Sequence, residues 1–259
     1  MALSLARVQP LGRSARNLAL SVAVLAVAGA LVSRRVAAAR RGARSAEALA
    51  ASVARGDTLL RVPHIAGGIT LDGDTDDPGW VHAPGPARTG AFLVENGRPA
   101  RPYSETRVVW GGDYLYLALY ASDEDIETHT DRPDAPNGLD DAFRVVFSQG
   151  DVDYAIEVTP SAVITDSTRK GDGAWNFAWS SGVHVSREID GSMNDPKNMD
   201  EEWAIEMAIP FASLGMKGEP GENIAMTLTR CDTPKRSPRV CAGWGEAQDG
   251  HGRGRIVLE

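Results

Sequence analysis

The stretch AFRVVFSQGDVDYAIEV, Ala142–Val158, contains two runs in which apolar residues occupy every second position, separated by a Gly-Asp turn. Because side chains alternate between the two faces of a β-strand, each run predicts a strand with one apolar face. With the turn centred on Gly150 and Asp151, a shift of one residue would bury the Arg144 and Glu157 charges, so a single register is favoured. The antiparallel partners expected in that register are Phe143 with Val158, Val145 with Ile156, Phe147 with Tyr154, and Arg144 with Glu157.

Short runs rich in Val, Ile, Tyr and Phe continue on both sides of this hairpin, and clusters of Gly, Pro, Asp and Asn separate them. This pattern is typical of an all-β fold, and we predict an antiparallel β-sandwich of the jelly-roll type. One helical turn is expected at Phe211–Leu214, before Gly215. The expected strands are Thr106–Trp110, Tyr114–Ala121, Ala142–Ser148, Tyr154–Thr159, Ala162–Asp166, Gly182–Glu188, Glu202–Pro210, Asn223–Arg230, Arg239–Trp244 and Gly254–Leu258.

The N-terminal part of the chain differs in composition from the rest. Leu18–Val32, LALSVAVLAVAGALV, is uncharged and nearly all apolar, and arginines stand on both sides of it. A membrane-spanning helix needs roughly 20 apolar residues, and the flanking Asn17 and Ser33 bring the segment close to that length. We predict a signal anchor or a signal peptide over residues 1–35, an Ala- and Arg-rich helical spacer over 36–60, and the β-sandwich over 61–259.

Two interpretations of the apolar segment stay open. Ala28-Gly29-Ala30 has the small residues of a cleavage site, whereas the arginines that follow it favour an uncleaved anchor. Arginines are denser after the segment than before it, which by the positive-inside rule indicates a cytoplasmic domain. The cysteines oppose this, because Cys231 and Cys241 bracket one turn and predict a disulfide, hence an oxidising compartment. We therefore expect a membrane-anchored domain on the extracytoplasmic side, in the periplasm or at the cell surface.

Several classes of function are disfavoured by the sequence. The formal net charge of −8 argues against nonspecific nucleic-acid binding by the chain as a whole. No HExxH motif, CxxC motif, nucleophile motif or phosphate-binding loop is present. Asp140 and Asp141 are adjacent and would diverge on a strand, and Glu157 faces Arg144, so neither suits a glycosidase carboxylate pair. We predict a binding domain rather than an enzyme.

Six segments, taken in order, together resemble a known family. They include an acidic turn that leads into Trp80, an acid-led strand that begins at Leu139, and a late strand that ends in an Ile-Pro-Phe corner. In full they are Ile69–Trp80, Thr106–Ile126, Leu139–Gly150, Asp200–Gly215, Pro220–Asp232 and Gly254–Glu259. The segments resemble those of the family 9 carbohydrate-binding modules over the region from Ile65 to Glu259. The resemblance implies a β-sandwich that binds sugars, often as an appendage of xylan-degrading enzymes.

The resemblance also implies a set of site residues. In the best-known branch two tryptophans clamp the sugar; Trp244 stands near the second position, whereas Gly138 stands near the first. The family uses a charged pair on adjacent strands to hold hydroxyl groups, and Arg144 and Glu157 fall at those positions. Sugar recognition needs an aromatic face and planar polar groups. The candidate ligand-binding residues are Arg144, Glu157, Trp244, Asp140, Asp141 and Arg230, and the expected partner is a polysaccharide or oligosaccharide of xylan or cellulose type.

Two alternative functions and a calcium loop also have partial support in the sequence. Related sandwiches bind haem as electron-transfer subunits, and a scaffold that contacts other proteins at the membrane is a further alternative. Asp72, Asp74 and Asp76 imitate the start of a calcium loop but lack its glycine and final glutamate, so we expect them to stabilise a turn. No cofactor is predicted, although some relatives carry structural calcium. The residues available as haem ligands are Met193, Met199, Met207, Met216, His184 and His251.

Overall fold

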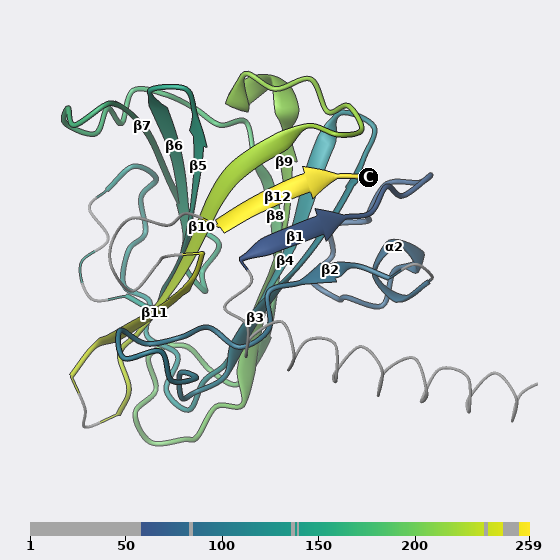
Figure 1. The fold of residues 1–259 in the computed structure, drawn as a ribbon. Coiled ribbons are helices and arrows are strands. Elements are labelled where there is room, and N and C mark those ends of the chain that lie inside the picture. The colour runs from purple at the N-terminus through teal and green to yellow at the C-terminus, as the bar shows by residue number, and fades with distance from the viewer. Residues whose placement is uncertain (1–57, 83–84, 136–137, 139, 236–237, 246–253) are drawn as a thin grey trace, which may run out of the picture. The chain divides into compact units, whose positions relative to one another are not determined.

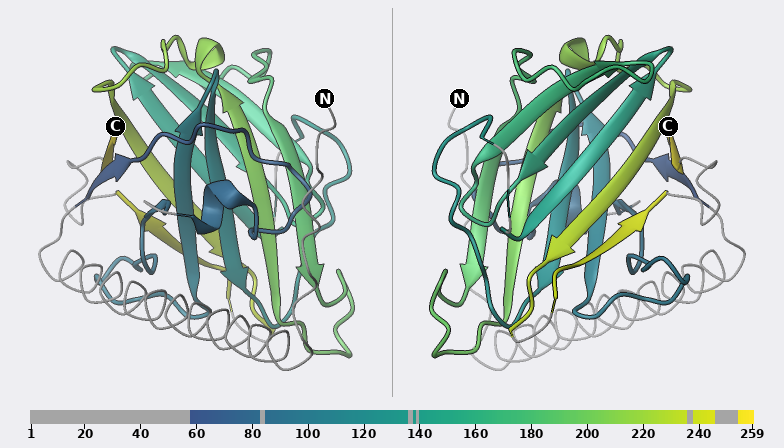
Figure 2. Two further views of the ribbon diagram at one scale, coloured as in Figure 1. Left: turned by 90° about the vertical axis from the view of Figure 1, so that its right-hand side faces the viewer. Right: turned by 90° about the vertical axis from the view of Figure 1, so that its left-hand side faces the viewer.

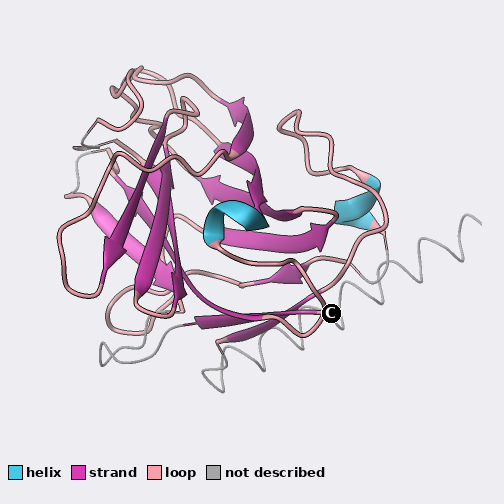
Figure 3. Ribbon diagram, turned by 90° about the horizontal axis from the view of Figure 1, so that it is seen from above, coloured by secondary structure: helices cyan, strands magenta, loops and turns pink. Residues whose placement is uncertain are grey.

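The computed structural model describes residues 58–259, except 83–84, 136–137, 139, 236–237 and 246–253. The predicted anchor over 1–35 and most of the spacer over 36–60 lie outside the described residues. Strands form nearly all of the regular structure, with two short helical segments, α2 (Pro78–Val81) and the 3-10 turn η1 (Phe211–Leu214) (Figure 3). Neither described helix has the length and apolar character needed to cross a bilayer.

Sheet A is the larger of the two sheets in the described part of the chain. Its strands follow the order β1-β12-β10-β5-β6-β7, and β11 pairs with the far end of β10. All of its pairs are antiparallel except β1 with β12, which lie side by side at one edge (Figures 1 and 2). The strands are β1 (Leu59–Val62), β5 (Ala142–Gln149), β6 (Val152–Val158), β7 (Ile164–Lys170), β10 (Asn223–Asp232), β11 (Val240–Trp244) and β12 (Gly254–Leu258).

Sheet B is fully antiparallel, in the order β2-β3-β4-β9-β8. It packs face to face against sheet A, as the ring contact at 5.0 Å between Phe143 on β5 and Trp203 on β9 shows. The predicted β-sandwich is therefore confirmed. The strands of sheet B are β2 (Ala87–Arg88), β3 (Ser104–Gly111), β4 (Tyr114–Ser122), β8 (His184–Asp190) and β9 (Glu202–Pro210).

The predicted hairpin register is confirmed, because Phe143 pairs with Val158, Arg144 with Glu157, and Phe147 with Tyr154. All ten expected strands are present, and most of their ends differ from the prediction by a few residues. The largest shift is at the end of β7, which runs to Lys170 instead of the expected Asp166. The strand begins at Ile164 because the preceding residues form a tight turn in which Ala162 has a φ of 62°. The sequence pattern missed β1 and β2, which have only four and two residues and no clear alternation.

The core lies between the two sheets and is built from the apolar positions of the alternating strands. Trp80, Trp110 and Trp203 are buried, and Trp179 is partly buried against the core. The fully buried side chains that fill the space between the sheets include Phe143, Phe147, Ile156, Leu115, Leu117, Leu119, Ile205, Met207, Leu228 and Ile256. Burial of this apolar surface is the main contribution to the stability of the fold.

The segment that precedes β2 covers the central part of the outer face of sheet B. Trp80 of α2, Val109 of β3 and Tyr116 of β4 form a second small core there, against which Ile65 and Ile69 pack. Glu206 on β9 is fully buried beneath this segment, where its carboxylate accepts hydrogen bonds from three groups. The donors are the backbone N–H of Asp72 at 3.1 Å, that of Gly73 at 2.8 Å and the indole N–H of Trp80 at 2.8 Å.

The acidic turn before α2 is stabilised by two of its carboxylates, of which Asp72 is one of the three acids expected to do so. The backbone N–H of Asp74 donates to the Asp72 carboxylate, and the backbone N–H of Thr70 donates to the Asp77 carboxylate. Gly73 has a φ of 101°, and a Cβ there would lie 2.4 Å from the backbone oxygen of Arg187 on β8. Only glycine therefore allows this turn to lie against sheet B.

Substitution of Glu206 by Gln is expected to lower the free energy of unfolding by about 1–3 kcal/mol, because the amide cannot accept all three buried hydrogen bonds. Urea denaturation of the full-length chain measures this. Glu188→Gln is the matched control: Glu188 is exposed on β8 of the same sheet, so a change below about 0.5 kcal/mol is expected. Equal effects of the two substitutions would contradict the anchoring role of Glu206.

Candidate functional site

The outer face of sheet A is polar, in contrast with the covered outer face of sheet B. Strand register places its outward side chains in three successive cross-strand rows. The first row is Arg255, Ala225, Ser148, Asp153 and Arg169, from β12 to β7; the second is Thr227, Val146, Ala155 and Ser167; the third is Thr229, Arg144, Glu157 and Thr165. A row of small residues thus lies between two rows that carry charges. We call this surface the trough.

Each charged row of the trough contains an ion pair. Arg169 donates to Asp153 at 2.6 Å in the first row, and Arg144 donates to Glu157 at 3.4 Å in the third. The arginine side chains are 31% and 30% exposed, so solvent reaches both pairs. Pairs exposed to this degree contribute at most about 1 kcal/mol to stability. Their groups remain available to a ligand, with donors and acceptors fixed by the register of β5, β6 and β7.

Trp175, in the loop between β7 and β8, stands over the trough. Asn176 forms two backbone hydrogen bonds with Thr168 at the edge of β7, so the side chains before and after it point to the outer face. The Trp175 ring centroid lies 4.8 Å from the guanidinium carbon of Arg144 and 4.6 Å from that of Arg169. Because these arginines come from rows on either side of the small residues, the ring lies above the middle row.

The middle row is correspondingly shielded. Ala155 and Ser167 are 0% and 1% exposed although they lie on the outer face of the sheet, whereas Phe177 beside Trp175 is 47% exposed. The trough therefore contains one partly exposed indole, held by two cation–π contacts, and one exposed phenyl ring.

A groove continues from the first row toward the strand ends and the turns that join them. Its volume is about 620 Å³, and it is lined by the first-row side chains together with the β5–β6 and β7–β8 turns. The polar groups along it include Ser148, Asp153, Arg169, Glu222, Asn223 and Arg255. A surface of this size with convergent polar groups has the dimensions of a small-ligand site.

The structure does not bring the six predicted ligand-binding residues together. Arg144 and Glu157 lie in the trough, but Trp244 is 8% exposed and packs in the core between the sheets. Asp140 is 3% exposed and accepts a hydrogen bond from the backbone N–H of Thr130 at 2.7 Å. Arg230 and Asp141 are buried in a separate cluster. Residue type alone could not distinguish the exposed candidates from the buried ones, because burial at a strand end depends on which loop covers it.

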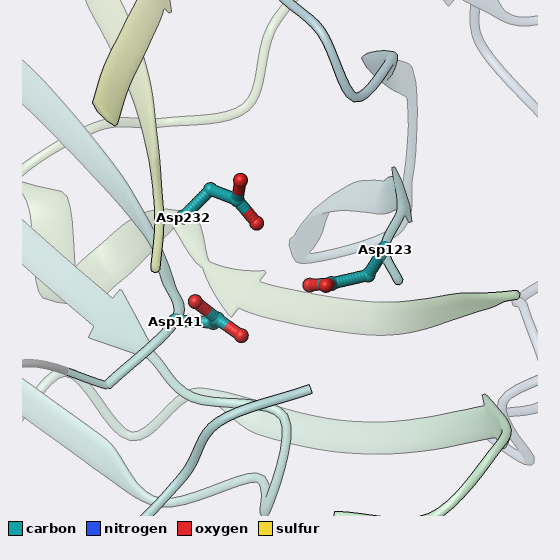
Figure 4. A group of neighbouring side chains, drawn as sticks. All are labelled: Asp123, Asp141 and Asp232. Atoms are coloured by element: carbon teal, nitrogen blue, oxygen red, sulfur yellow. The ribbon is translucent and has the colours of Figure 1, made fainter. Parts of the chain in front are cut away.

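The buried carboxylate cluster consists of Asp123, Asp141 and Asp232, which follow β4, precede β5 and end β10 (Figure 4). Their carboxylates point toward one another, and one oxygen from each lies within 4.8 Å of the others. Arg230 donates to Asp123 at 2.8 Å and to Asp232 at 2.7 Å. The indole N–H of Trp203 also donates to Asp123, at 2.9 Å. Carboxylate oxygens are the ligands that hard cations such as Ca²⁺ prefer, so among the described residues this cluster has the groups that could hold a metal ion.

The disulfide predicted between Cys231 and Cys241 is present and links β10 to β11 as a directly paired cross-strand bond. Cys231 lies between Arg230 and Asp232 in the sequence, so the disulfide restrains the end of β10 that carries both residues. The sulfur atoms therefore stabilise the strand end that contributes to the buried carboxylate cluster.

No protein-family model matches the sequence, and no curated protein matches it significantly. Solved structures match its fold. One is a protein of Bacteroides uniformis named for carbohydrate binding, with a TM-score of 0.61 and 13% identity over 78% of this chain and 99% of that chain. Another is a family 9 carbohydrate-binding module of Caldicellulosiruptor kristjanssonii in complex with cellotriose, with a TM-score of 0.52 and 13% identity over 77% of this chain and 93% of that one. The chain has the fold of the family 9 modules.

A family 9 module from the same organism, in complex with glucose, matches with a TM-score of 0.50 and 13% identity, over 77% of this chain and 95% of that chain. The resemblance noted in the sequence is thus confirmed at the level of the fold. On this family 9-like fold, sequence reasoning identified Arg144 and Glu157 but missed Trp175, Arg169 and Asp153. The alternation of β6 and β7 placed Asp153 and Arg169 on the same face as Arg144, a signal that could have found them.

The pH dependence of stability tests the electrostatics of the buried carboxylate cluster. Burial, together with the charge of Asp123, raises the pKa of Asp141 from 3.8 to about 8. Burial raises the pKa of Asp232 to about 6, against the lowering effect of Arg230. The charged groups around Asp141 are Asp123, Asp232 and Arg230, with Glu124, Asp125 and Lys235 beside them.

In a chelating buffer, the free energy of unfolding should fall as the pH rises from about 4 to about 8, because the folded chain keeps protons that the unfolded chain releases. The slope is at most about 1.4 kcal/mol per pH unit for each proton. Urea denaturation at several pH values measures it. Asp141→Asn imitates the protonated group and should flatten the slope between pH 6 and 8. An unchanged slope in that variant would refute the assignment to Asp141.

Proposed function

We propose that this protein is a non-catalytic binding domain for an oligosaccharide or polysaccharide, with the trough on sheet A as its site. The observation that carries the proposal is the combination, on one open face, of two ion pairs in fixed register and a partly exposed indole above a row of small residues. The likeness in fold to the module that was solved with cellotriose supports the same class of ligand.

The chemistry of the trough suits a sugar. A pyranose ring has hydroxyl groups around its edge, which pair with planar donors and acceptors, and apolar C–H faces, which pack on aromatic rings. Arg144 and Arg169 supply donors, and Glu157 and Asp153 supply acceptors. Trp175 and Phe177 supply aromatic surface at the β7 side. Because Trp175 is held in place by two guanidinium groups, little ordering of the indole is needed on binding.

The same contacts favour binding without cleavage. Each carboxylate of the trough is ion-paired with an arginine of its own row. A retaining or inverting glycosidase instead places one acid and one base or nucleophile on opposite sides of the scissile bond. The pairs Arg144–Glu157 and Arg169–Asp153 are suited to holding hydroxyl groups. Xylan and cellulose chains, which combine neutral charge with many equatorial hydroxyl groups, are the ligands we propose first.

The binding test uses the full-length chain, purified in detergent, on an array with xylan and cello-oligosaccharides, with and without Ca²⁺. Arg144→Ala and Trp175→Ala should each weaken binding by about tenfold or more, as expected for loss of a charged hydrogen bond or an aromatic contact. Arg61→Ala is the matched control, since Arg61 is an exposed arginine of sheet A that pairs with Glu259 on a different part of the sheet. It should leave binding unchanged.

Two results would overturn the proposal. One is a folded protein that binds no glycan, which would leave a scaffold for protein contacts. The other is glycan binding that survives both trough substitutions. A Soret absorption band would indicate haem instead; of the residues considered as ligands, Met207 and Met216 lie in the core, Met199 is 74% exposed, and His251 lies outside the described residues.

We further propose that the domain is held at the extracytoplasmic face of a membrane by the segment Leu18–Val32. The Cys231–Cys241 disulfide supports an oxidising compartment, and the arginines that follow the small residues Ala28-Gly29-Ala30 support an uncleaved anchor. In cell fractions, the chain should sediment with membranes after carbonate washing and should react with a thiol reagent only after reduction. Thiols that react without reduction would place the domain in the cytoplasm.

A further inference from the structure

The first row of the trough extends across the whole of sheet A. It continues beyond Arg255, because β1 pairs with β12 and brings Leu59 opposite Arg255. Neighbouring strands lie about 4.8 Å apart, so the part of the row from β12 to β7 is about 19 Å long. The side chains of the row, from β1 to β7, are Leu59, Arg255, Ala225, Ser148, Asp153 and Arg169.

The groove of about 620 Å³ follows this row across the strands. Asn223 and Arg255 line it on the β10 and β12 side, and Arg169 and Asp172 line it on the β7 side. Arg255 and Asp172, at its two ends, are exposed, so within the described residues both ends are open to solvent. The small side chain of Ala225 lies between them. An elongated ligand can therefore lie along the groove and extend beyond it in both directions.

Polar groups stand on both sides of the small residue. The Nε atom of Arg255 donates to Oδ1 of Asn223 at 2.8 Å, which orients the guanidinium group on one side. Arg169 donates to Asp153 at 2.6 Å on the other side. A guanidinium group has five N–H donors, so these bonds leave donors for the hydroxyl groups of a ligand. Because the two arginines come from strands about 19 Å apart, one sugar ring cannot contact both, whereas a chain of several rings can.

The charge of the groove does not favour an acidic ligand. The lining residues supply two guanidinium groups, and Lys170 beside them pairs with Asp151 at 3.4 Å. Four carboxylates oppose these three cations, those of Asp151, Asp153, Asp172 and Glu222. Like charges that meet across a binding surface disfavour the complex, so a chain of uronic acids gains no net attraction here. A neutral chain avoids this repulsion and keeps the hydroxyl groups that the groove can bind.

We propose that the groove extends the trough into a path for the interior of an uncharged glycan chain, which crosses sheet A from β12 to β7 with about four sugar rings in contact. This inference rests on the proposed function and adds a length and a direction to it. Rings near β7 pass beside Trp175, which contacts Arg169 of the same row. Arg255 and Asn223 hold hydroxyl groups of the rings at the far end. Binding along the chain, and not at its terminus, follows from the two open ends of the groove.

The first test compares glycans of different length by calorimetry with the full-length chain in detergent. Affinity should rise by about tenfold or more from cellobiose to cellotetraose, as the ligand reaches Arg255, and should then level off. A long soluble xylan should bind several protein molecules per chain, and borohydride reduction of its terminal ring should leave that binding unchanged. Polygalacturonate should bind more weakly than xylan.

The outcomes separate the inference from the function on which it rests. Binding of one protein per xylan chain would overturn the inference and retain the proposed function. Equal affinity for cellobiose and cellotetraose would do the same, and binding of polygalacturonate as tight as that of xylan would contradict the uncharged ligand. Binding of no glycan would overturn both.

Substitutions at the far end of the groove test the path itself. Arg255→Ala should weaken cellotetraose binding by about tenfold and leave cellobiose binding unchanged, because cellobiose held beside Trp175 does not reach β12. Trp175→Ala should weaken both. Arg132→Ala is the control, since the side chain of Arg132 is 84% exposed in the loop between β4 and β5, at the opposite end of β5 from Ser148. It should alter neither. Equal losses for the two ligands in Arg255→Ala, or no loss for either, would refute the path.

Discussion

The bridge that Arg230 makes between Asp123 and Asp232 links the two sheets in the interior of the sandwich. Arg230 and Asp232 belong to β10 of sheet A, and Asp123 follows β4 of sheet B, so the bridge fixes how the strand ends face each other. A buried arginine and its acids are costly unless every group is satisfied, which restricts the arrangement of the neighbouring strands. Trp203 couples this network to the core, since its indole bonds Asp123 while its ring packs on Phe143.

The two outer faces of the sandwich have different roles as a consequence of this architecture. The centre of the outer face of sheet B is covered by the segment from Ile65 to Val81, which Glu206 holds by three hydrogen bonds, and this part of the face is buried. Sheet A keeps alternating polar residues on its free face, where cross-strand pairing brings Arg144 to Glu157 and Arg169 to Asp153. A ligand from solvent therefore meets fixed polar groups on sheet A.

The buried cluster and the trough use the same residue types in different surroundings. Acids and arginines in the trough are partly exposed and paired one to one, whereas the cluster places three buried acids around one arginine. Solvent screens the charges of the trough. The buried charges of the cluster are instead stabilised only by the groups around them. For this reason the charged groups of the trough remain open to solvent and to a ligand, whereas those of the cluster belong to the interior of the fold.

The sequence by itself determined ten of the twelve described strands, the register of the Ala142–Val158 hairpin and the disulfide, because these follow from local alternation and from two cysteines that bracket one turn. It also placed Arg144 and Glu157 side by side. Only the tertiary structure decided that Trp244, Asp140, Asp141 and Arg230 are buried and that Trp175 stands over the trough. These outcomes depend on contacts between segments far apart in the chain, and neither residue type nor strand periodicity encodes which loop covers which face.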